Sequence, residues 1–285
     1  MRTTRLTIAI AIAVVTLPGT AAIIARSQLA GIGAGALLFP SRHLNARPIP
    51  DGCVNRTFIG DNLTLDGWQC TSPAPVHRGT AIYLHGVADN RGSSIETIQR
   101  LLPRGYDVIA YDSRAHGASQ GDRCTYGYFE KRDLQHVLDQ IGVDEVILIG
   151  HSLGGAIALQ AAAVDHRVRA VVAAATFADL RSIATERAPS VFTPSLIDAA
   201  FARAEHDGKF VVDDVSPLLA AADITVPALI IHGALDIDTR PAHSERVFAA
   251  LRGPKELLII RDAGHNDALN REAWAAIERW IDALG

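Results

Sequence analysis

The segment that most constrains the fold lies in the middle of the chain, where Glu145-Val-Ile-Leu-Ile-Gly-His-Ser-Leu-Gly-Gly leads into an alanine-rich stretch ending near Val164. A β-branched apolar run followed by an alanine-rich run predicts a buried strand, a sharp turn and a helix. Gly150 and Gly154 flank Ser152 in the pattern G-x-S-x-G. A serine on such a strained turn is crowded, and glycines two positions away on either side relieve the crowding. The pattern therefore predicts a serine whose hydroxyl is exposed for attack on a carbonyl.

The composition limits the class of protein. The chain has 285 residues, of which 48% are hydrophobic. That is enough for one substantial core but not for two large domains. The formal net charge is −4 and no long run of Lys and Arg occurs, so we expect no nucleic-acid partner. The three cysteines do not have the spacing of a zinc site, so we expect no metal.

The N-terminal residues, numbered 1–40, predict a targeting segment followed by a linker. An uncharged segment from Leu6 to Ala25 follows Arg2 and Arg5. Twenty helical residues rise about 30 Å, enough to cross a bilayer, whereas the part before Pro18 has only the length of a signal peptide core. We predict an uncleaved signal anchor, with the folded domain outside the cytoplasm because the arginines favour a cytoplasmic N-terminus. Cleavage and secretion stay open as the alternative.

Small residues and prolines follow this segment. The run Gly31-Ile-Gly-Ala-Gly-Ala36 matches G-x-G-x-x-[GA] but lacks the preceding strand of a dinucleotide site, so we interpret it as a flexible linker. The stretch from Pro40 to Asp51 contains three prolines and continues the linker.

Two cysteines lie symmetrically about a predicted turn. Cys53 and Cys70 lie symmetrically about position 61.5, and Gly60-Asp61-Asn62 at that midpoint has the composition of a hairpin turn. They are therefore candidates to face each other across a hairpin and to form a disulfide in an oxidising compartment. Two unpaired strand cysteines are an equally weighted alternative.

The folded domain, residues 53–285, alternates short apolar runs with helical patterns. Such alternation predicts an α/β fold, a doubly wound and mostly parallel sheet preceded by an antiparallel hairpin. The predicted strands are Asn55–Gly60, Leu63–Cys70, Thr80–Leu84, Asp107–Tyr111, Glu145–Ile149, Val168–Ala174, Ala228–Ile231 and Glu256–Ile260. The predicted helices are Ser94–Leu102, Glu130–Gln140, Leu153–Val164, Ala242–Leu251 and Arg271–Ala283.

Residues 179–226 interrupt this alternation of strands and helices. They contain helical fragments such as Ser195–His206 and no clear strand. Because ligands bind at the carboxyl ends of parallel strands, a helical insertion here is placed to cover the site. We predict a short helical cap.

A serine nucleophile needs a base and a carboxylate that orients the base. His265 follows the last predicted strand in a loop, whereas His243 lies inside a predicted helix, so we predict His265 as the base. Asp236 lies a few residues beyond the Ala228–Ile231 strand and is the preferred acid. Asp179, which follows the Val168–Ala174 strand, stays open as the second candidate.

The order of these motifs resembles the α/β-hydrolase superfamily. The ordered set is Gly150-His-Ser-Leu-Gly154, His232-Gly-Ala-Leu-Asp236 and Gly264-His265. Three further segments are similar to that family's oxyanion loop, its D-x-R-x-x-G-x-S turn and the segment before the next helix: Leu84-His85-Gly86-Val87, Asp112-Ser-Arg-Ala-His-Gly-Ala-Ser119 and Tyr126-Gly-Tyr-Phe-Glu-Lys-Arg-Asp133. The resemblance covers Asn55 to Gly285.

The N-terminus ending in Leu38-Phe-Pro-Ser-Arg-His43 resembles a membrane-tethered subgroup with a short cap, similar to serine aminopeptidase and monoacylglycerol-lipase-like hydrolases. The oxyanion segment has one glycine after its histidine and so departs from the HGGG form of many lipases. His85, His116, His151 and His232 all flank glycines near predicted strand ends, and we interpret them as hydrogen-bonded loop residues rather than metal ligands.

The resemblance implies that His265 deprotonates Ser152, that Asp236 holds the imidazole, and that the backbone N–H groups of Val87 and Leu153 bind the oxyanion. It implies no cofactor. We expect a serine hydrolase that cleaves ester or thioester bonds of a small-molecule acyl substrate, with lipid-derived acyl groups as one class, and that is held to the membrane by its N-terminal segment. A peptidase on the same fold is the alternative enzyme, and a non-catalytic binding module is the alternative of another class. The sequence predicts no oligomeric state.

Overall fold

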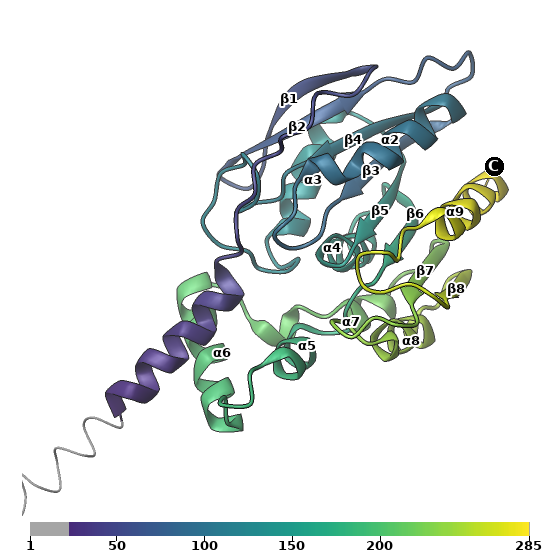
Figure 1. Ribbon diagram of the computed structural model, residues 1–285. Coiled ribbons are helices and arrows are strands. Elements are labelled where there is room, and N and C mark those ends of the chain that lie inside the picture. Colours follow the sequence, from purple (N-terminus) through teal and green to yellow (C-terminus); the bar gives the residue numbers. More distant parts are fainter. Residues whose placement is uncertain (1–22, 285) are drawn as a thin grey trace, which may run out of the picture.

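A central eight-stranded sheet organises the molecule (Figure 1). The structure is a computed structural model that describes residues 23–284. The strands are β1 (Cys53–Ile59), β2 (Thr64–Cys70), β3 (Gly79–Leu84), β4 (Tyr106–Tyr111), β5 (Val146–His151), β6 (Val168–Ala174), β7 (Ala228–Gly233) and β8 (Lys255–Ile260). They lie in the order β1-β2-β4-β3-β5-β6-β7-β8. All neighbours from β4 onward are parallel, and the β1–β2 hairpin is antiparallel. The predicted α/β-hydrolase architecture is confirmed.

Helices cover both faces of the sheet, and alternating strand residues point to the two layers. In β3, Ile82 and Leu84 belong to one core cluster, while Ala81 and Tyr83 belong to the other. The first cluster contains side chains of α3 (Glu130–Ile141), α4 (Leu153–Ala162), α7 (Pro217–Ala221) and α8 (Pro241–Ala250). The second contains side chains of α2 (Ile95–Leu101) and α9 (Arg271–Ala283). Because almost every residue of the central strands β3 to β7 is buried under one layer or the other, these parallel strands appear in the sequence as continuous apolar runs.

The segment between β6 and β7 is helical, as expected for the cap. It contains α5 (Leu180–Arg187), α6 (Pro194–Gly208), a 3₁₀ turn η3 (Val212–Asp214) and α7. Two more 3₁₀ turns, η1 (Arg91–Ser94) and η2 (Leu102–Arg104), flank α2. Side chains of α5, α6 and η3 form most of a third core cluster.

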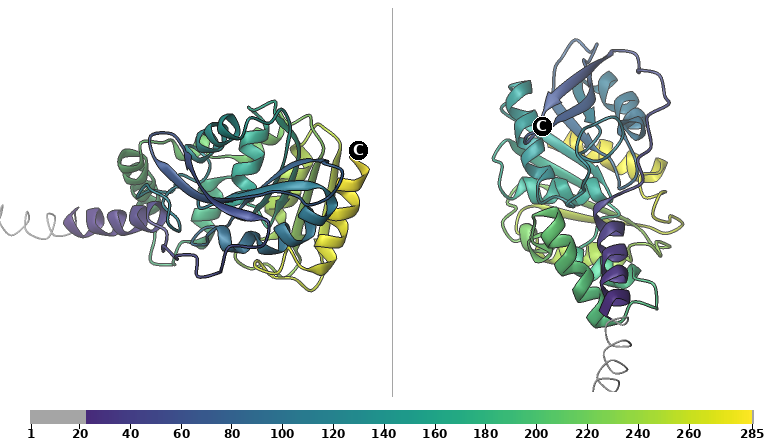
Figure 2. Two further views of the ribbon diagram at one scale, coloured as in Figure 1. Left: turned by 90° about the horizontal axis from the view of Figure 1, so that it is seen from above. Right: turned by 90° about the vertical axis from the view of Figure 1, so that its left-hand side faces the viewer.

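A helix over residues 23–38 packs against this cap (Figures 1 and 2). Leu38 and Ala34 are buried with Phe201 and Phe210 in the third core cluster. The run Gly31–Ala36 therefore lies in a docked helix, and the prediction of a flexible linker there is wrong. Its glycines do not loosen the chain, because burial of the neighbouring apolar side chains outweighs their low helix propensity.

The predicted anchor, Leu6–Ala25, lies largely outside the described residues. Within residues 23–284, no helix combines the length and the apolar character needed to span a bilayer.

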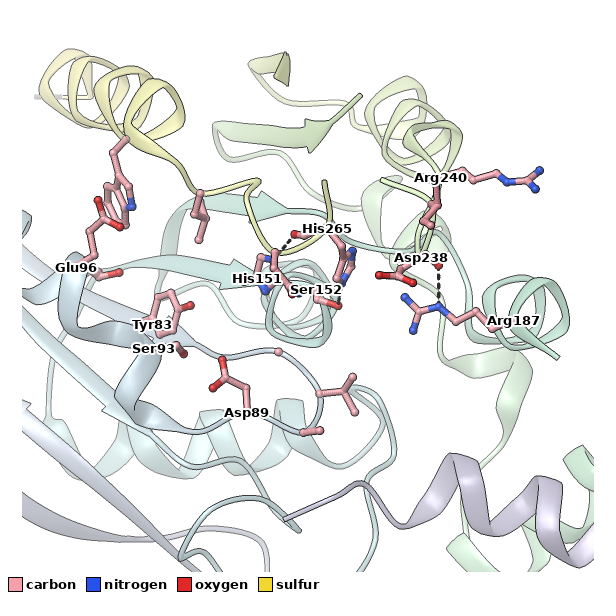
Figure 3. Close-up of a pocket in the computed structure, with 18 of the residues that line it drawn as sticks. Tyr83, Asp89, Ser93, Glu96, His151, Ser152, Arg187, Asp238, Arg240 and His265 are labelled. Atoms are coloured by element: carbon pink, nitrogen blue, oxygen red, sulfur yellow. Dashed lines mark hydrogen bonds between the residues drawn. The ribbon is translucent and has the colours of Figure 1, made fainter. Parts of the chain in front are cut away.

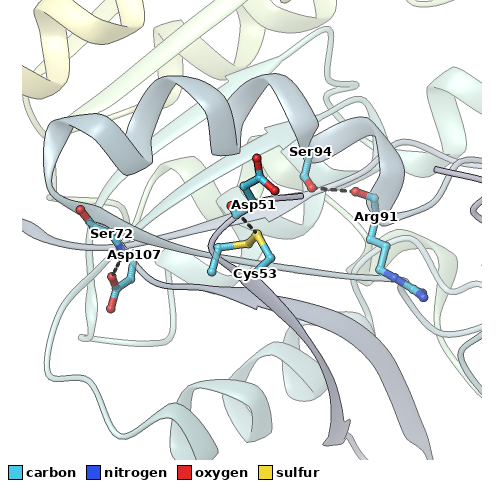
Figure 4. The surroundings of a disulfide bond; sticks show 7 residues. Asp51, Cys53, Ser72, Arg91, Ser94 and Asp107 are labelled. Carbon is cyan, nitrogen blue, oxygen red and sulfur yellow. Dashed lines mark hydrogen bonds between the residues drawn. A yellow bond between two sulfur atoms is a disulfide. The ribbon is translucent and has the colours of Figure 1, made fainter. Parts of the chain in front are cut away.

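The β1–β2 hairpin contains a disulfide between Cys53 and Cys70 (Figure 4). The two cysteines are direct partners in the strand register, with Ile59 opposite Thr64 at the turn end. The pairing inferred from their symmetry about the turn is therefore present in the structure. Cys124, the remaining cysteine, is buried and unpaired.

Candidate active site

Ser152 lies on the sharp turn between β5 and α4. Its backbone has φ +52° and ψ −112°, a left-handed φ that costs energy in a residue other than glycine. A Cβ on Gly150 would lie 2.2 Å from the Gly154 carbonyl oxygen, and one on Gly154 would lie 1.9 Å from the Leu84 carbonyl oxygen. Both glycines are therefore required by close backbone approach, which is the reason the sequence pattern suggested.

Three side chains from distant parts of the chain form one hydrogen-bonded chain at this turn (Figure 3). The Ser152 hydroxyl lies 2.9 Å from His265 Nε2 and donates to it. His265 Nδ1 lies 2.7 Å from Asp236 Oδ2 and donates to that carboxylate. Ser152 follows β5, Asp236 follows β7 and His265 follows β8, so all three lie at the carboxyl edge of the sheet.

The Asp236 carboxylate is held in its ionised form by hydrogen bonds. Burial alone would raise its pKa, but bonds from His232, from His265 and from the Thr239 amide outweigh burial and hold the pKa well below its usual range. The Thr239 and Asp238 amides donate to Oδ1 at 2.8 and 2.9 Å. A carboxylate in this state stabilises a positively charged imidazole.

The alternative acid and base have other partners. Asp179 caps the N-terminus of α5 by accepting from the Ser182 amide at 2.7 Å, and it pairs with Arg246. His243 is buried in α8, where its Nδ1 accepts from the Ala178 amide at 3.1 Å. Neither contacts Ser152, and Asp236 and His265 occupy the positions that the sequence preferred.

The loop after β3 approaches Ser152 from the other side. A Cβ on Gly86 would lie 3.7 Å from Ser152 Cβ, so the loop backbone passes close to the serine. Within the described residues, the amides of Val87 and Leu153 donate no hydrogen bond to the protein. Leu153 is the first residue of α4, whose first amides have no partner inside the helix. Both amides are therefore free to receive an anionic oxygen.

His85 fixes this loop from beneath. Its Nε2 accepts from the Ser113 amide at 2.9 Å, and its Nδ1 donates to the Gly86 carbonyl at 2.7 Å. Burial lowers the pKa of His85, so the ring is neutral, as one donated and one accepted hydrogen bond require. The D-x-R-x-x-G-x-S turn adds a second support, because Asp112 accepts from the Arg91 and Ala118 amides at 2.7 and 2.8 Å.

The serine opens into a cleft of about 900 Å³. Tyr83, Ser93 and Glu96 lie on one side of Ser152, and Arg187 and Arg240 lie on the other (Figure 3). The cleft therefore has polar walls of both charges around a central nucleophile.

Three residues to which sequence reasoning gave no role in the site support the hydrogen-bonded chain, His232 and His151 by direct contact and Arg187 through the loop that follows Asp236. His232 Nε2 lies 3.1 Å from Asp236 Oδ2, and its Nδ1 lies 2.6 Å from Ser244 Oγ. His151 Nε2 donates to the His265 carbonyl at 2.9 Å. Arg187 donates to the Asp238 carbonyl at 2.7 Å and to Thr239 Oγ1 at 2.8 Å. The histidines next to glycines were a visible signal, whereas Arg187 had none.

His116, another of the four histidines that were weighed as metal ligands, also has partners within the protein. His116 packs edge-on against His85 at 5.1 Å between ring centroids, and its Nδ1 lies 2.9 Å from the Arg114 carbonyl. Across residues 23–284, no group of three or more His, Cys, Asp and Glu side chains is arranged to hold a metal ion.

Comparison with known proteins agrees with this fold. The model of the alpha/beta hydrolase fold matches residues 82–206. Among curated relatives, the uncharacterized protein YfhR of Escherichia coli is 29% identical over 221 residues, 74% of this chain and 72% of that protein. The uncharacterized protein YqkD of Bacillus subtilis is 32% identical over 199 residues, 65% of this chain and 64% of that protein.

Two solved structures share the fold. A Pyrococcus furiosus esterase superposes with a TM-score of 0.67 at 21% identity, over 87% of this chain and 96% of that one. A Pyrococcus horikoshii acylaminoacyl peptidase superposes with a TM-score of 0.63 at 14% identity, over 81% of this chain and 41% of that one. With its sheet order, its serine turn and the match over residues 82–206, this chain has the alpha/beta hydrolase fold.

Proposed function

We propose that this protein is a serine hydrolase that cleaves carboxylic ester or thioester bonds through an acyl-enzyme intermediate. The observation that carries the proposal is the hydrogen-bonded chain from Asp236 through His265 to the Ser152 hydroxyl, at the mouth of a cleft. A serine is a weak nucleophile by itself, and this arrangement gives it a base and gives the base a counter-charge.

The reaction follows from the atoms involved. Ser152 Oγ attacks the carbonyl carbon of the substrate while His265 Nε2 takes the hydroxyl proton. The tetrahedral oxyanion then accepts from the amides of Val87 and Leu153. His265 returns the proton to the leaving alcohol or thiol, which leaves an acyl group on Ser152. Water, deprotonated by the same imidazole, attacks that ester and releases the carboxylic acid.

The oxyanion donors and Asp236 stabilise the charges that form in the transition state of this scheme. Each oxyanion donor lowers the activation free energy by about 3 kcal/mol, as judged from enzymes in which one was removed, because it binds charge that develops only in the transition state. Asp236 stabilises the imidazolium that forms during the attack, and its lowered pKa keeps it charged for that purpose.

Location is a second part of the proposal. The apolar segment from Leu6 to Ala25 supports a membrane-attached enzyme, and the Cys53–Cys70 disulfide supports an oxidising compartment for the folded domain. Together they support an extracytoplasmic enzyme with access to lipid-derived acyl substrates. A cleaved signal peptide and a secreted enzyme are the alternative.

Labelling with a fluorophosphonate probe tests the nucleophile. The purified protein is expected to be labelled and to hydrolyse p-nitrophenyl acyl esters, and Ser152→Ala is expected to lose both activities. Ser93→Ala is the matched control, since Ser93 lines the same cleft without a base beside it and its loss should leave labelling intact. Undiminished labelling of Ser152→Ala would refute the assignment.

The same preparation separates the alternatives. A strong preference for amino-acid p-nitroanilides over esters would make the enzyme a peptidase. Labelling of Ser152 without turnover of any acyl substrate would instead favour a binding module. Asp236→Asn is expected to lower kcat by roughly 10⁴-fold with the fold intact, by analogy with the same change in a serine protease.

A further inference from the structure

A second cavity, of about 320 Å³, lies between the helix over residues 23–38 and the cap helices α5 and α6. Its volume is within the range of small-ligand pockets. The lining residues are almost all apolar or small, among them Gly33, Ala36, Ala184, Phe192, Ala200 and Phe201, with Tyr126 and Arg187 as the exceptions. The Tyr126 hydroxyl donates to the Leu37 carbonyl at 3.1 Å, so it is already used within the protein.

The N-terminal helix is a fixed wall of this cavity. A Cβ on Gly33 would lie 2.8 Å from Ala200 Cβ and 2.9 Å from Phe192 Cε1, so the helix backbone touches the cap directly. The Cys124 amide donates to the Leu38 carbonyl at 2.8 Å, which ties the end of the helix to the catalytic domain. The N-terminal helix and the cap therefore line one apolar cavity.

Arg187 joins this cavity to the active site. It lines both the apolar cavity and the cleft that contains Ser152. Its guanidinium is held on the Asp238 carbonyl and Thr239 Oγ1, in the loop that carries Asp236. In Figure 3 it lies on the opposite side of Ser152 from Tyr83 and Glu96, so the cavity adjoins the cleft at the end away from that polar side.

We propose that this cavity binds the hydrocarbon chain of the ester substrate, with the N-terminal helix and the cap forming its two walls. The proposal rests on the proposed function and narrows the substrate class to esters with an extended apolar chain. A polar substrate would gain nothing from an apolar cavity that adjoins the cleft at Arg187, whereas each methylene buried there raises kcat/KM by about fourfold. Arg187 lies where the chain passes from the ester bond into the cavity.

The test fills the cavity and measures chain-length preference in the full-length protein in detergent. Ala36→Trp and Ala184→Leu each place bulk into the cavity from opposite walls. Gln28→Trp is the matched control, because Gln28 is exposed on the same helix and does not line the cavity. Each variant is assayed with p-nitrophenyl acetate and decanoate, which vary the acyl chain, and with ethyl and decyl acetate, which vary the alcohol.

Wild type is expected to prefer the ten-carbon chain over the two-carbon chain in one of the two series. The series that shows this preference identifies whether the acyl or the alcohol side of the ester enters the cavity. The filling variants should lose at least tenfold in kcat/KM for that chain and stay within twofold on the short substrates, while Gln28→Trp matches wild type. Equal losses of kcat/KM on short and long chains, or undiminished activity on the ten-carbon substrate in both filling variants, would overturn the inference. Either result would leave the proposed hydrolase function unaffected. Failure of wild type to hydrolyse any ester would instead refute the proposed function.

Discussion

At the scale of single residues, the turn around Ser152 leaves almost no freedom of side-chain choice. The serine has a left-handed φ, and both flanking glycines are in contact with backbone atoms that cannot move aside. Sequence reasoning found this turn because steric crowding by backbone can be recognised from residue type alone.

Gly154→Ala tests that crowding. The new methyl group would meet the Leu84 carbonyl oxygen at 1.9 Å, so β3 and α4 must separate. We expect the free energy of unfolding to fall by about 3 kcal/mol, the upper range for overpacking, with loss of ester hydrolysis. Urea unfolding followed by circular dichroism measures the change.

Gly31→Ala provides the comparison, because no atom lies within 4 Å of the added Cβ and the site is in a helix. Alanine should stabilise that position by up to about 1 kcal/mol. Equal stability of the two variants would show that crowding at Gly154 is not what selects glycine.

The contacts around the hydrogen-bonded chain were only partly predictable. Asp236 and His265 could be placed because each follows a recognisable strand. His232 looked like a loop histidine, and its contact with Asp236 depends on the path of residues 236–239, which pattern alone does not specify. Arg187 contacts that path from the cap, about fifty positions earlier in the chain, so no local signal could have linked them.

At the scale of elements, the strands were the most predictable part of the molecule. Val168–Ala174 and Arg271–Ala283 match β6 and α9 as predicted, and the other boundaries moved by one or two residues. Apolar runs indicate strands that are buried on both faces, and the helical period between the runs indicates the helices, so both kinds of element can be located from the sequence. Ends shift because terminal residues are decided by caps and by pairing with neighbours.

The contribution of the hairpin disulfide to the free energy of unfolding can be measured by reducing the wild-type protein. Cys53 and Cys70 are separated by 17 positions, and closing a loop of that length lowers the entropy of the unfolded chain by an amount worth about 3 kcal/mol at 25 °C. We expect reduction of the wild type to lower the free energy of unfolding by up to that amount. Ester hydrolysis should persist, because β1 is the edge strand farthest in the sheet order from β7 and β8.

The double variant Cys53→Ser, Cys70→Ser is the control for this measurement. Its stability should not respond to dithiothreitol, and it should resemble the reduced wild type. A wild type whose unfolding is unchanged by reductant, with both thiols shown to be free after treatment, would contradict the stabilising role of the disulfide.

At the scale of the whole molecule, the N-terminal helix is the part that sequence reasoning interpreted least well. Its glycines and alanines suggested a linker, yet they allow close contact with the cap, where Gly33 meets Ala200 and Phe192. Whether a small-residue run is a linker or a packing surface depends on a partner far away in the chain, and the partner here, α6, lies more than 150 positions later. Local composition cannot distinguish the two.

Gly33→Leu tests whether this docking is part of the fold. Leucine cannot fit where a methyl group would already lie 2.8 Å from Ala200 Cβ, so the helix should separate from the cap. We expect amide hydrogen exchange to rise by at least tenfold in residues 29–38 and in α6, while exchange in the strands stays unchanged because the sheet core does not include this contact. Gly31→Leu, in open space on the same helix, should leave exchange in α6 at the wild-type rate. Unchanged protection of α6 in Gly33→Leu would mean that the cap does not depend on the N-terminal helix, and that the catalytic domain completes its fold without it.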